Sequence, residues 1–411
     1  MVAIALCFFL AGFALTGLYR PPLPDVPPGH RPASAVEPPP PSTGTRLLPL
    51  PGEFERQAAL MIGTTQLIYT APQVYVDIVS AVHRHVCVIS LVSGQAEIAE
   101  AKRLLTQARV SPAAVRFIGI RLNSAWARDY GPLFSRRADG SVVVLDLEYS
   151  GRRETGERAT DAQVARKFAR LVGARWLPMP LGIPGGNLLS NGDGLYVSTV
   201  AAAMPSRSRT KTPQTASAGS GKAQARLDAL TARLGGQQWL ALEPLRDEPS
   251  QDIDMFLTFV ARDVAVVGRL DPAREPANAA ILDRAAARLA AVRTSRGPMK
   301  VHRIPMPPPR NGSWRSYNNV VFANGVLLMP KFSDDDPTLR HTALALYAQL
   351  LPGWQIVGIR SDKLEQVDGY LHCLTRNVPW FVPPPRLPET AAPSSRAAPT
   401  EPVARREGGP R

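Results

Sequence analysis

Three stretches of this 411-residue chain carry side chains that could do chemistry, two through carboxylates and one through a thiol. Asp129 lies in WARDYGP, Asp252 and Asp254 lie in SQDIDMF, and Cys373 lies in DGYLHCLT. Two carboxylates on an apolar segment need a cation or water beside them, because an unpaired buried charge is costly. A cysteine is a nucleophile when it is a thiolate. Each stretch is therefore a candidate site on residue type alone.

Each stretch also has an ordinary structural explanation. Asp129 could accept hydrogen bonds from the backbone amides of a turn. If SQDIDMF is a strand, Asp252 and Asp254 share one side of it, and that side could face water at an exposed edge. Cys373 could be a buried structural cysteine. On a strand, the same alternation puts His372 on the face opposite Cys373, so we do not expect His372 to assist it.

The cysteines argue against a disulfide-stabilised fold and a metal site. The chain has three of them. Cys7 lies in an apolar N-terminal run, and Cys87 lies in the apolar segment VCVIS, where it is most simply a small core residue. No framework of disulfides is possible, and no CxxC pair suggests a metal ligand set. We therefore expect no metal.

A repeating order of elements would position the candidate residues. Two short strands joined by a tight turn, then a helix, then another strand recur after residue 50. Asn-Gly pairs such as Asn324-Gly325 mark the hairpin turns, because both residues tolerate positive φ. Five ββαβ units would close into a ring, a five-bladed α/β propeller. An open doubly wound sheet is the competing α/β fold, and repeated hairpins argue against it. Hydrophobic periodicity predicts the helices at 72–85, 95–107, 161–172, 222–234, 277–292 and 338–350.

Composition divides the chain into four parts. Residues 1–20 hold the apolar run 2–18, which predicts a signal peptide or membrane anchor and so an exported or membrane-anchored protein. A buried N-terminal helix is the alternative. Residues 21–50 form a Pro-rich linker, and 381–411 form a disordered Pro-rich tail, since they have few apolar residues to bury. The folded domain is predicted at 51–380.

The net charge of +14 raises the question of a nucleic-acid partner. The arginines are scattered, and the segment SRSRTKTPQTASAGSGK collects several in a predicted loop. The sequence carries no RNP-like aromatic strand, zinc-ligand spacing or helix-turn-helix signal. We therefore expect a solvated basic surface and no nucleic-acid partner.

Six stretches of the predicted domain form an ordered set: WARDYGP (126–132), GGNLLSNGDG (185–194), DIDMFLTFV (252–260), SYNNVVFANGVLLMP (316–330), LPGWQIVGI (351–359) and HCLTRNVP (372–379). Together they resemble the agmatine deiminase and bacterial peptidylarginine deiminase family. The resemblance implies the five-bladed propeller (pentein) fold and hydrolysis of a guanidine to a ureido group and ammonia, without metal or organic cofactor. It implies that Asp129 and Asp254 grip the substrate, that Cys373 is the nucleophile and that Trp126 walls the pocket; a core aromatic is the alternative for Trp126.

The chain departs from that family at two places. Relatives carry Gly-His-x-Asp where this chain has Gln251-Asp252-Ile253-Asp254, and they commonly carry a Glu where Pro184 precedes Gly-Gly. An imidazolium stabilises a thiolate, whereas a carboxylate raises the pKa of the cysteine. Asp252, crowded by other carboxylates, could instead act as the acid. General acid–base help is worth about 10²–10⁴ in rate, so we expect a slow enzyme or an inactive one.

Several functions remain open at this point. The first is a deiminase acting on peptidyl-arginine or on agmatine, a small arginine-like molecule. An amidinotransferase is a variant with the same thiolate chemistry. The second class is a lapsed enzyme that still binds guanidinium groups, and the third is an interaction protein that uses its Pro-rich tails.

Overall fold

A computed structural model of the chain describes residues 46–148, 160–179, 181–200, 221–310, 312–367 and 369–386. The predicted leader 1–20, most of the linker and most of the C-terminal tail lie outside the described residues. Within the described ranges, no helix has both the length and the apolar character that a membrane span requires. The expectations of export and membrane attachment stay predictions.

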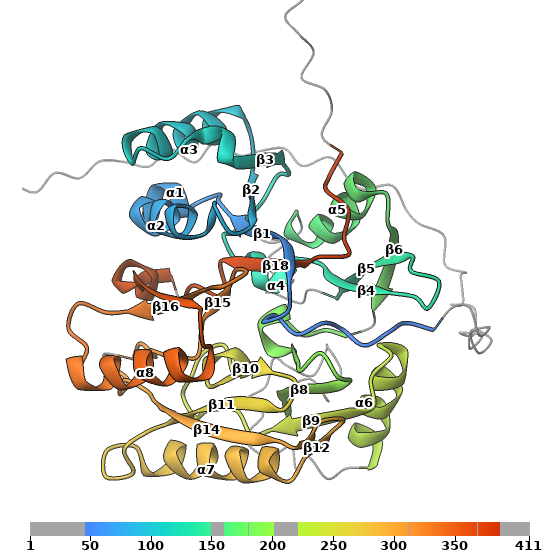
Figure 1. Cartoon of the computed structure of the whole chain (residues 1–411), viewed down its shortest axis with the longest axis vertical. Helices are drawn as coiled ribbons and strands as arrows, with labels where there is room; N and C mark the ends of the chain where they lie inside the picture. Colours follow the sequence, from blue (N-terminus) through green and yellow to red (C-terminus); the bar gives the residue numbers. More distant parts are fainter. Residues whose placement is uncertain are drawn as a thin grey trace, which may run out of the picture. The chain divides into compact units, whose positions relative to one another are not determined.

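Four three-stranded sheets share one connectivity, in which an antiparallel hairpin is followed by a helix and by a third strand parallel to the second. In chain order these sheets are β4-β5-β6, β7-β8-β9, β10-β11-β14 and β15-β16-β17. Figure 1 shows the helix of each unit beside its strands. The strands are β4 (Leu133–Arg136), β5 (Val142–Leu147), β6 (Arg175–Met179), β7 (Leu189–Ser190), β8 (Leu195–Thr199), β9 (Gln238–Leu242), β10 (Leu257–Ala261), β11 (Val264–Arg269), β14 (Lys300–Pro305), β15 (Val321–Phe322), β16 (Val326–Lys331) and β17 (Gln355–Arg360). The connecting helices are α5 (Val164–Val172), α6 (Gly221–Arg233), α7 (Pro276–Ala290) and α8 (Pro337–Leu350).

A fifth sheet joins the two ends of the domain. Its order is β18-β1-β2-β3, and β18 (Thr375–Pro379) pairs antiparallel with β1 (Gln57–Gly63). The remaining strands are parallel: β1 with β2 (Cys87–Val92), and β2 with β3 (Val115–Gly119). Helices α1 (Leu67–Thr70), α2 (Pro72–Val82) and α3 (Gln95–Gln107) belong to this unit. A small ribbon of β12 (Arg293–Thr294) and β13 (Gly297–Pro298) follows α7.

One helix of each unit also packs against the unit before its own. The apolar face of α5 packs against β1, β2 and β3, and α6 packs with residues of β5 and β6. In α7, Arg288 donates to the carbonyl of Ala241 in β9. Helix α8 contacts β14, and α2 contacts β16 and β17 of the last unit. Every sheet thus has its own helix and its successor's helix against it, which buries apolar side chains on both faces.

Most of the predicted helices are confirmed within a few residues, and two local predictions are wrong. Residues 253–255 of SQDIDMF form a 3-10 turn before β10 instead of a strand, and 371–374 form a turn before β18. Strand alternation therefore applies to neither segment. The start of the predicted tail is also packed: Val382 is buried, and the amide of Arg386 donates to the carbonyl of Leu171.

Asn324 in the β15–β16 hairpin ties the last unit to the first. Its φ is +47°, as expected for an Asn-Gly turn. Its side chain also accepts a bond from the amide of Gln57 (2.8 Å) and donates to the carbonyls of Gln57 (2.9 Å) and His85 (3.1 Å). The Asn is thus required both for its backbone and for its side chain.

We predict that Asn324→Ala lowers the free energy of unfolding by about 2 kcal/mol, because backbone groups of Gln57 lose their partners. Urea denaturation measures this. Asn324→Gly is the matched control, since it deletes the same bonds but relieves the positive φ, and it should lose less than the alanine variant. Equal stability of Asn324→Ala and the unaltered protein would contradict the assigned bonds.

Candidate active site

The end of β1 is where two of the predicted stretches meet. The amide of Gly63 donates to the carbonyl of Leu374 (2.9 Å), and a Cβ on Gly63 would lie 2.1 Å from the carbonyl oxygen of Ala125. The amide of Arg128, in the short helix α4 (Ala127–Tyr130), donates to the carbonyl of Cys373 (3.0 Å). WARDYGP and HCLT, about 245 residues apart, are therefore in direct contact.

Asp252 and Asp254 approach the same point on the Gly-Gly segment. A Cβ added to Gly186 would lie 2.9 Å from Asp254 Oδ2 and 3.2 Å from Asp252 Oδ2. Both carboxylates are buried, with 6% and 2% of the residue exposed. Only a residue without a side chain fits beside them, so Gly186 leaves room for the two carboxylates to converge.

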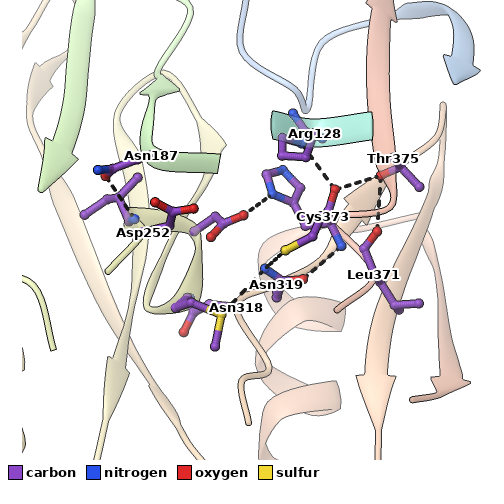
Figure 2. Close-up of polar contacts among 12 residues, drawn as sticks. Arg128, Asn187, Asp252, Asn318, Asn319, Leu371, Cys373 and Thr375 are labelled. Carbon is purple, nitrogen blue, oxygen red and sulfur yellow. Dashed lines mark hydrogen bonds and ion pairs between the residues drawn. The ribbon is translucent and has the colours of Figure 1, made fainter. Parts of the chain in front are cut away.

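Asn187 holds the segment that carries these carboxylates. Its Oδ1 accepts from the amides of Ile253 (3.2 Å) and Thr199 (2.9 Å), and it is completely buried. Figure 2 shows Asn187 beyond Asp252, and Cys373 with Asn319 facing Asp252 from the opposite side. The 3-10 turns η4 (Gly185–Asn187) and η7 (Ile253–Met255) are thereby fixed to each other.

Glu248 shapes the turn that precedes Asp252. Its carboxylate accepts from the amide and hydroxyl of Ser250 and from the amide of Gln251. Burial raises the pKa of Glu248 to about 7, although these bonds oppose the shift, and the charge of Asp254 adds to it. Gln251 itself adopts φ +57°, the left-handed region that favours glycine. Gln251 therefore adopts a backbone conformation that is strained for a residue with a side chain.

The sulfur of Cys373 lies among the predicted carboxylates. Burial raises the pKa of Cys373 well above its ordinary value, and the charges of Asp254, Asp129 and Asp252 raise it further. The side chain is half-buried, and Asn319 Nδ2 lies 3.8 Å from Sγ. The thiol is therefore neutral near pH 7.

Trp126 and Asp129 belong to the WARDYGP stretch but have different neighbours. The ring of Trp126 lies against Gly369, where a Cβ would come within 2.3 Å of it, and it packs against the apolar core. Asp129 is half-buried in α4 and is close enough to influence the thiol. The three predicted aspartates thus influence one sulfur, and the roles of all the predicted residues stay predictions.

His372 lies where the sequence did not place it. Because residues 371–374 form a turn, its ring points toward Asp254: Nδ1 is 2.7 Å from Asp254 Oδ2, and Nε2 is 2.7 Å from Glu53 Oε2. Only 3% of the residue is exposed. The expectation that His372 faces away from the site was wrong, because strand alternation was applied to a turn.

Three further charged residues of the site were not predicted from the sequence. The guanidinium of Arg128, 1% exposed, forms an ion pair with Glu53 and donates to the carbonyl of His372 (3.3 Å). Arg376 is buried as well, and burial together with Arg128 lowers its pKa to about 9. Arg128 could have been suspected from its place beside Asp129, but no local pattern marks Glu53.

The arrangement suits an organic cation with N–H donors. Asp254 Oδ1 is buried and has no hydrogen-bond partner among the described residues. Such an acceptor is costly unless a ligand or water donates to it. The described residues contain no group of three or more His, Cys, Asp or Glu side chains arranged to hold a metal ion. A planar guanidinium, with five donors, matches paired carboxylates.

Comparison with known proteins agrees with this description. A family model described as Porphyromonas-type peptidyl-arginine deiminase matches residues 50–379. The agmatine deiminase of Stutzerimonas stutzeri is 24% identical over 308 residues, which cover 67% of this chain and 80% of that protein.

Solved structures show the same fold. The agmatine deiminase of Enterococcus faecalis superimposes with a TM-score of 0.67 at 18% identity, covering 84% of this chain and 98% of that one. The C. jejuni agmatine deiminase gives a TM-score of 0.65 at 17% identity, covering 81% and 96%.

We predict that Gln251→Gly stabilises the protein by about 0.5–1 kcal/mol. A left-handed backbone destabilises an ordinary residue by about 1–2 kcal/mol, and glycine removes this strain. Glycine also gains conformational freedom in the unfolded chain, which offsets only part of the stabilisation. Urea denaturation measures the change. Gln251→Ala is the matched control and should bring no gain, because its Cβ keeps the strain. Equal stability of the two variants would contradict strain at this position.

We also predict that Cys373 reacts as a high-pKa thiol. In a Cys87→Ser background, the iodoacetamide alkylation rate of Cys373, followed by mass spectrometry of the peptide that contains it, should keep rising up to at least pH 9.5, because only the thiolate reacts. Free glutathione serves as the reference thiol. The readout is the shape of the plot of alkylation rate against pH, because the accessibility of the thiol to iodoacetamide changes only the absolute rate. A plateau below pH 8 would show that the site stabilises the thiolate.

Proposed function

The chain belongs to the Porphyromonas-type peptidyl-arginine deiminase family, and we propose that it hydrolyses a guanidinium group to a ureido group and ammonia. The family comprises hydrolases that act on C–N bonds of arginine-like substrates. One observation supports the proposal. The Cys373 thiol is close enough to Asp129, Asp252 and Asp254 for their charges to raise its pKa, and Asp254 Oδ1 is a buried acceptor without a hydrogen-bond partner among the described residues. Agmatine and peptidyl-arginine are the candidate substrates.

Binding uses the carboxylates on two different elements. Asp254 in η7 and Asp129 in α4 accept N–H bonds from the guanidinium, and Trp126 walls one side. Charge-assisted bonds of this kind are stronger than neutral ones. They fix the plane of the cation, so that its central carbon faces Cys373 Sγ in a near-attack arrangement.

The chemistry proceeds in two halves. The bound cation lowers the pKa of the thiol, Asp252 accepts the thiol proton, and Sγ forms a bond to the guanidinium carbon. Asp252 returns this proton to the leaving nitrogen, the C–N bond breaks, and ammonia departs from a thiouronium. Water then adds to the same carbon and the S–C bond breaks. The thiol and the ureido product are released, and the one remaining proton converts ammonia to ammonium.

Asp252 makes this enzyme slow. It stands where relatives carry a histidine, and its negative charge opposes the thiolate that an imidazolium would favour. The turnover number should therefore lie about 10²–10⁴ below that of a relative with the histidine.

We further infer that the five ββαβ units close into a propeller-like ring. The contact of α2 with β16 and β17 links the first unit to the last. The pairing of β18 with β1 joins the two ends of the domain. Both contacts are those that a closed ring of such units requires.

A second candidate function is a guanidinium-binding protein without turnover. The raised pKa of Cys373 favours it, because the carboxylates that attract a cation also keep the thiol neutral. The same pocket would then capture arginine-like groups and release them unchanged.

We predict slow formation of ureido product and ammonia from agmatine or an arginine peptide, abolished by Cys373→Ala. Asp252→His should raise the rate at least tenfold, because it restores an imidazole beside the thiol. Ammonia release in a coupled assay and mass spectrometry of the product measure both. Cys87→Ala is the matched control and should keep the activity.

The two candidates differ in outcome. Binding of agmatine by calorimetry without product after long incubation, in both the unaltered protein and Asp252→His, would support the binding protein. Absence of both binding and product would reject both candidates.

A further inference from the structure

We propose that His372 is a positioning residue that occupies Asp254 Oδ2 and holds this carboxylate in place, so that Oδ1 remains available to a guanidinium. The inference rests on the proposed function, in which Asp254 grips the substrate. It assigns a role to the histidine beside the nucleophile without requiring that its ring touch the substrate.

The geometry requires a protonated ring. A neutral imidazole has one N–H donor and one acceptor nitrogen. His372 places both ring nitrogens 2.7 Å from carboxylate oxygens, one of Asp254 and one of Glu53. Two ionised carboxylates only accept hydrogen bonds, so both nitrogens must donate. His372 is therefore an imidazolium bridging two carboxylates.

The charges around the ring agree with this assignment. Burial and the guanidinium of Arg128 in α4 oppose the protonation of His372. The charge of Glu53, before β1, and the hydrogen bonds of the ring to Asp254, in η7, and to Glu53 outweigh them and raise the pKa of His372. Burial also opposes ionisation of Glu53, but Arg128 and His372 hold its pKa far below the usual range. The result is a buried row of alternating charges, from Arg128 through Glu53 and His372 to Asp254.

Asp254 needs such a partner because its other neighbours are acidic. Asp252 approaches the same glycine, and Glu248 lies close enough for its pKa to feel the charge of Asp254. Like charges repel one another, so this crowded carboxylate needs a donor that holds it in place. Without the bond from His372, Asp254 would turn away from Asp252, and its hold on a cation would weaken.

The test is the pH dependence of agmatine binding, measured by calorimetry between pH 6 and 8.5 in a Cys373→Ala background to exclude turnover. With His372 present, Kd should change less than threefold over this range. In His372→Gln, whose amide replaces only the Nε2 side of the ring, Kd should rise at least tenfold at every pH, because Asp254 Oδ2 loses its donor. In His372→Asn, whose amide replaces the Nδ1 side that faces Asp254, Kd should stay within threefold of the parent. His341→Gln, an exposed histidine on α8, is the matched control and should behave like the parent.

The outcomes separate the two proposals. If the parent binds no agmatine, the proposed function fails, and this inference fails with it. If the parent binds agmatine but His372→Gln shows an unchanged Kd, or if His372→Gln and His372→Asn weaken binding equally, only the positioning role is overturned. An equal loss would show that His372 merely supports the fold.

A second measurement needs no variant at His372. In ¹⁵N-histidine-labelled protein, one of the six imidazoles should stay protonated at both ring nitrogens at a pH at which free histidine is neutral. Titration of all six rings near pH 6.5 would overturn the inference even if His372→Gln does not fold.

Discussion

The balance of buried charge around Cys373 is the constraint on which this site depends. Four carboxylates meet three cations there, and isolated charges cannot remain in such surroundings without partners. One negative charge is left over, and a guanidinium would neutralise it. Ionising the thiol in the empty site would add a second, so the substrate itself is the best source of compensation. The charged residues are Glu53, Asp129, Asp252 and Asp254, facing Arg128, His372 and Arg376.

The fold meets this constraint by bringing turns together rather than strands. Gly63, at the end of β1, touches both the WARDYGP and the HCLT segments, and Gly186 lets two carboxylates converge. Each of these positions is a close backbone approach that a side chain would block. The sheets and their helices fix the ends of the strands, and the chemistry lies in the short turns between them.

The features that could be predicted from the sequence are those that short stretches of sequence determine. Helix periodicity found α3 at Gln95–Gln107, and residue type singled out Asp254 and Cys373. The orientation of His372 was missed because a period of two was applied to a turn. Glu53 could not be found at all, since its importance comes from contacts with residues about 75 and 319 positions away. Long-range charge pairing leaves no periodic trace in a sequence.

A carboxylate at position 252 has opposite effects on a cation and on a thiolate. Its negative charge favours a bound cation, and together with the charges of Asp254 and Asp129 it raises the pKa of Cys373. The turn before it has a left-handed backbone at Gln251, a conformation that favours glycine. Under the proposed function, cation binding and the reactivity of the sulfur therefore make opposite demands on the charge at position 252.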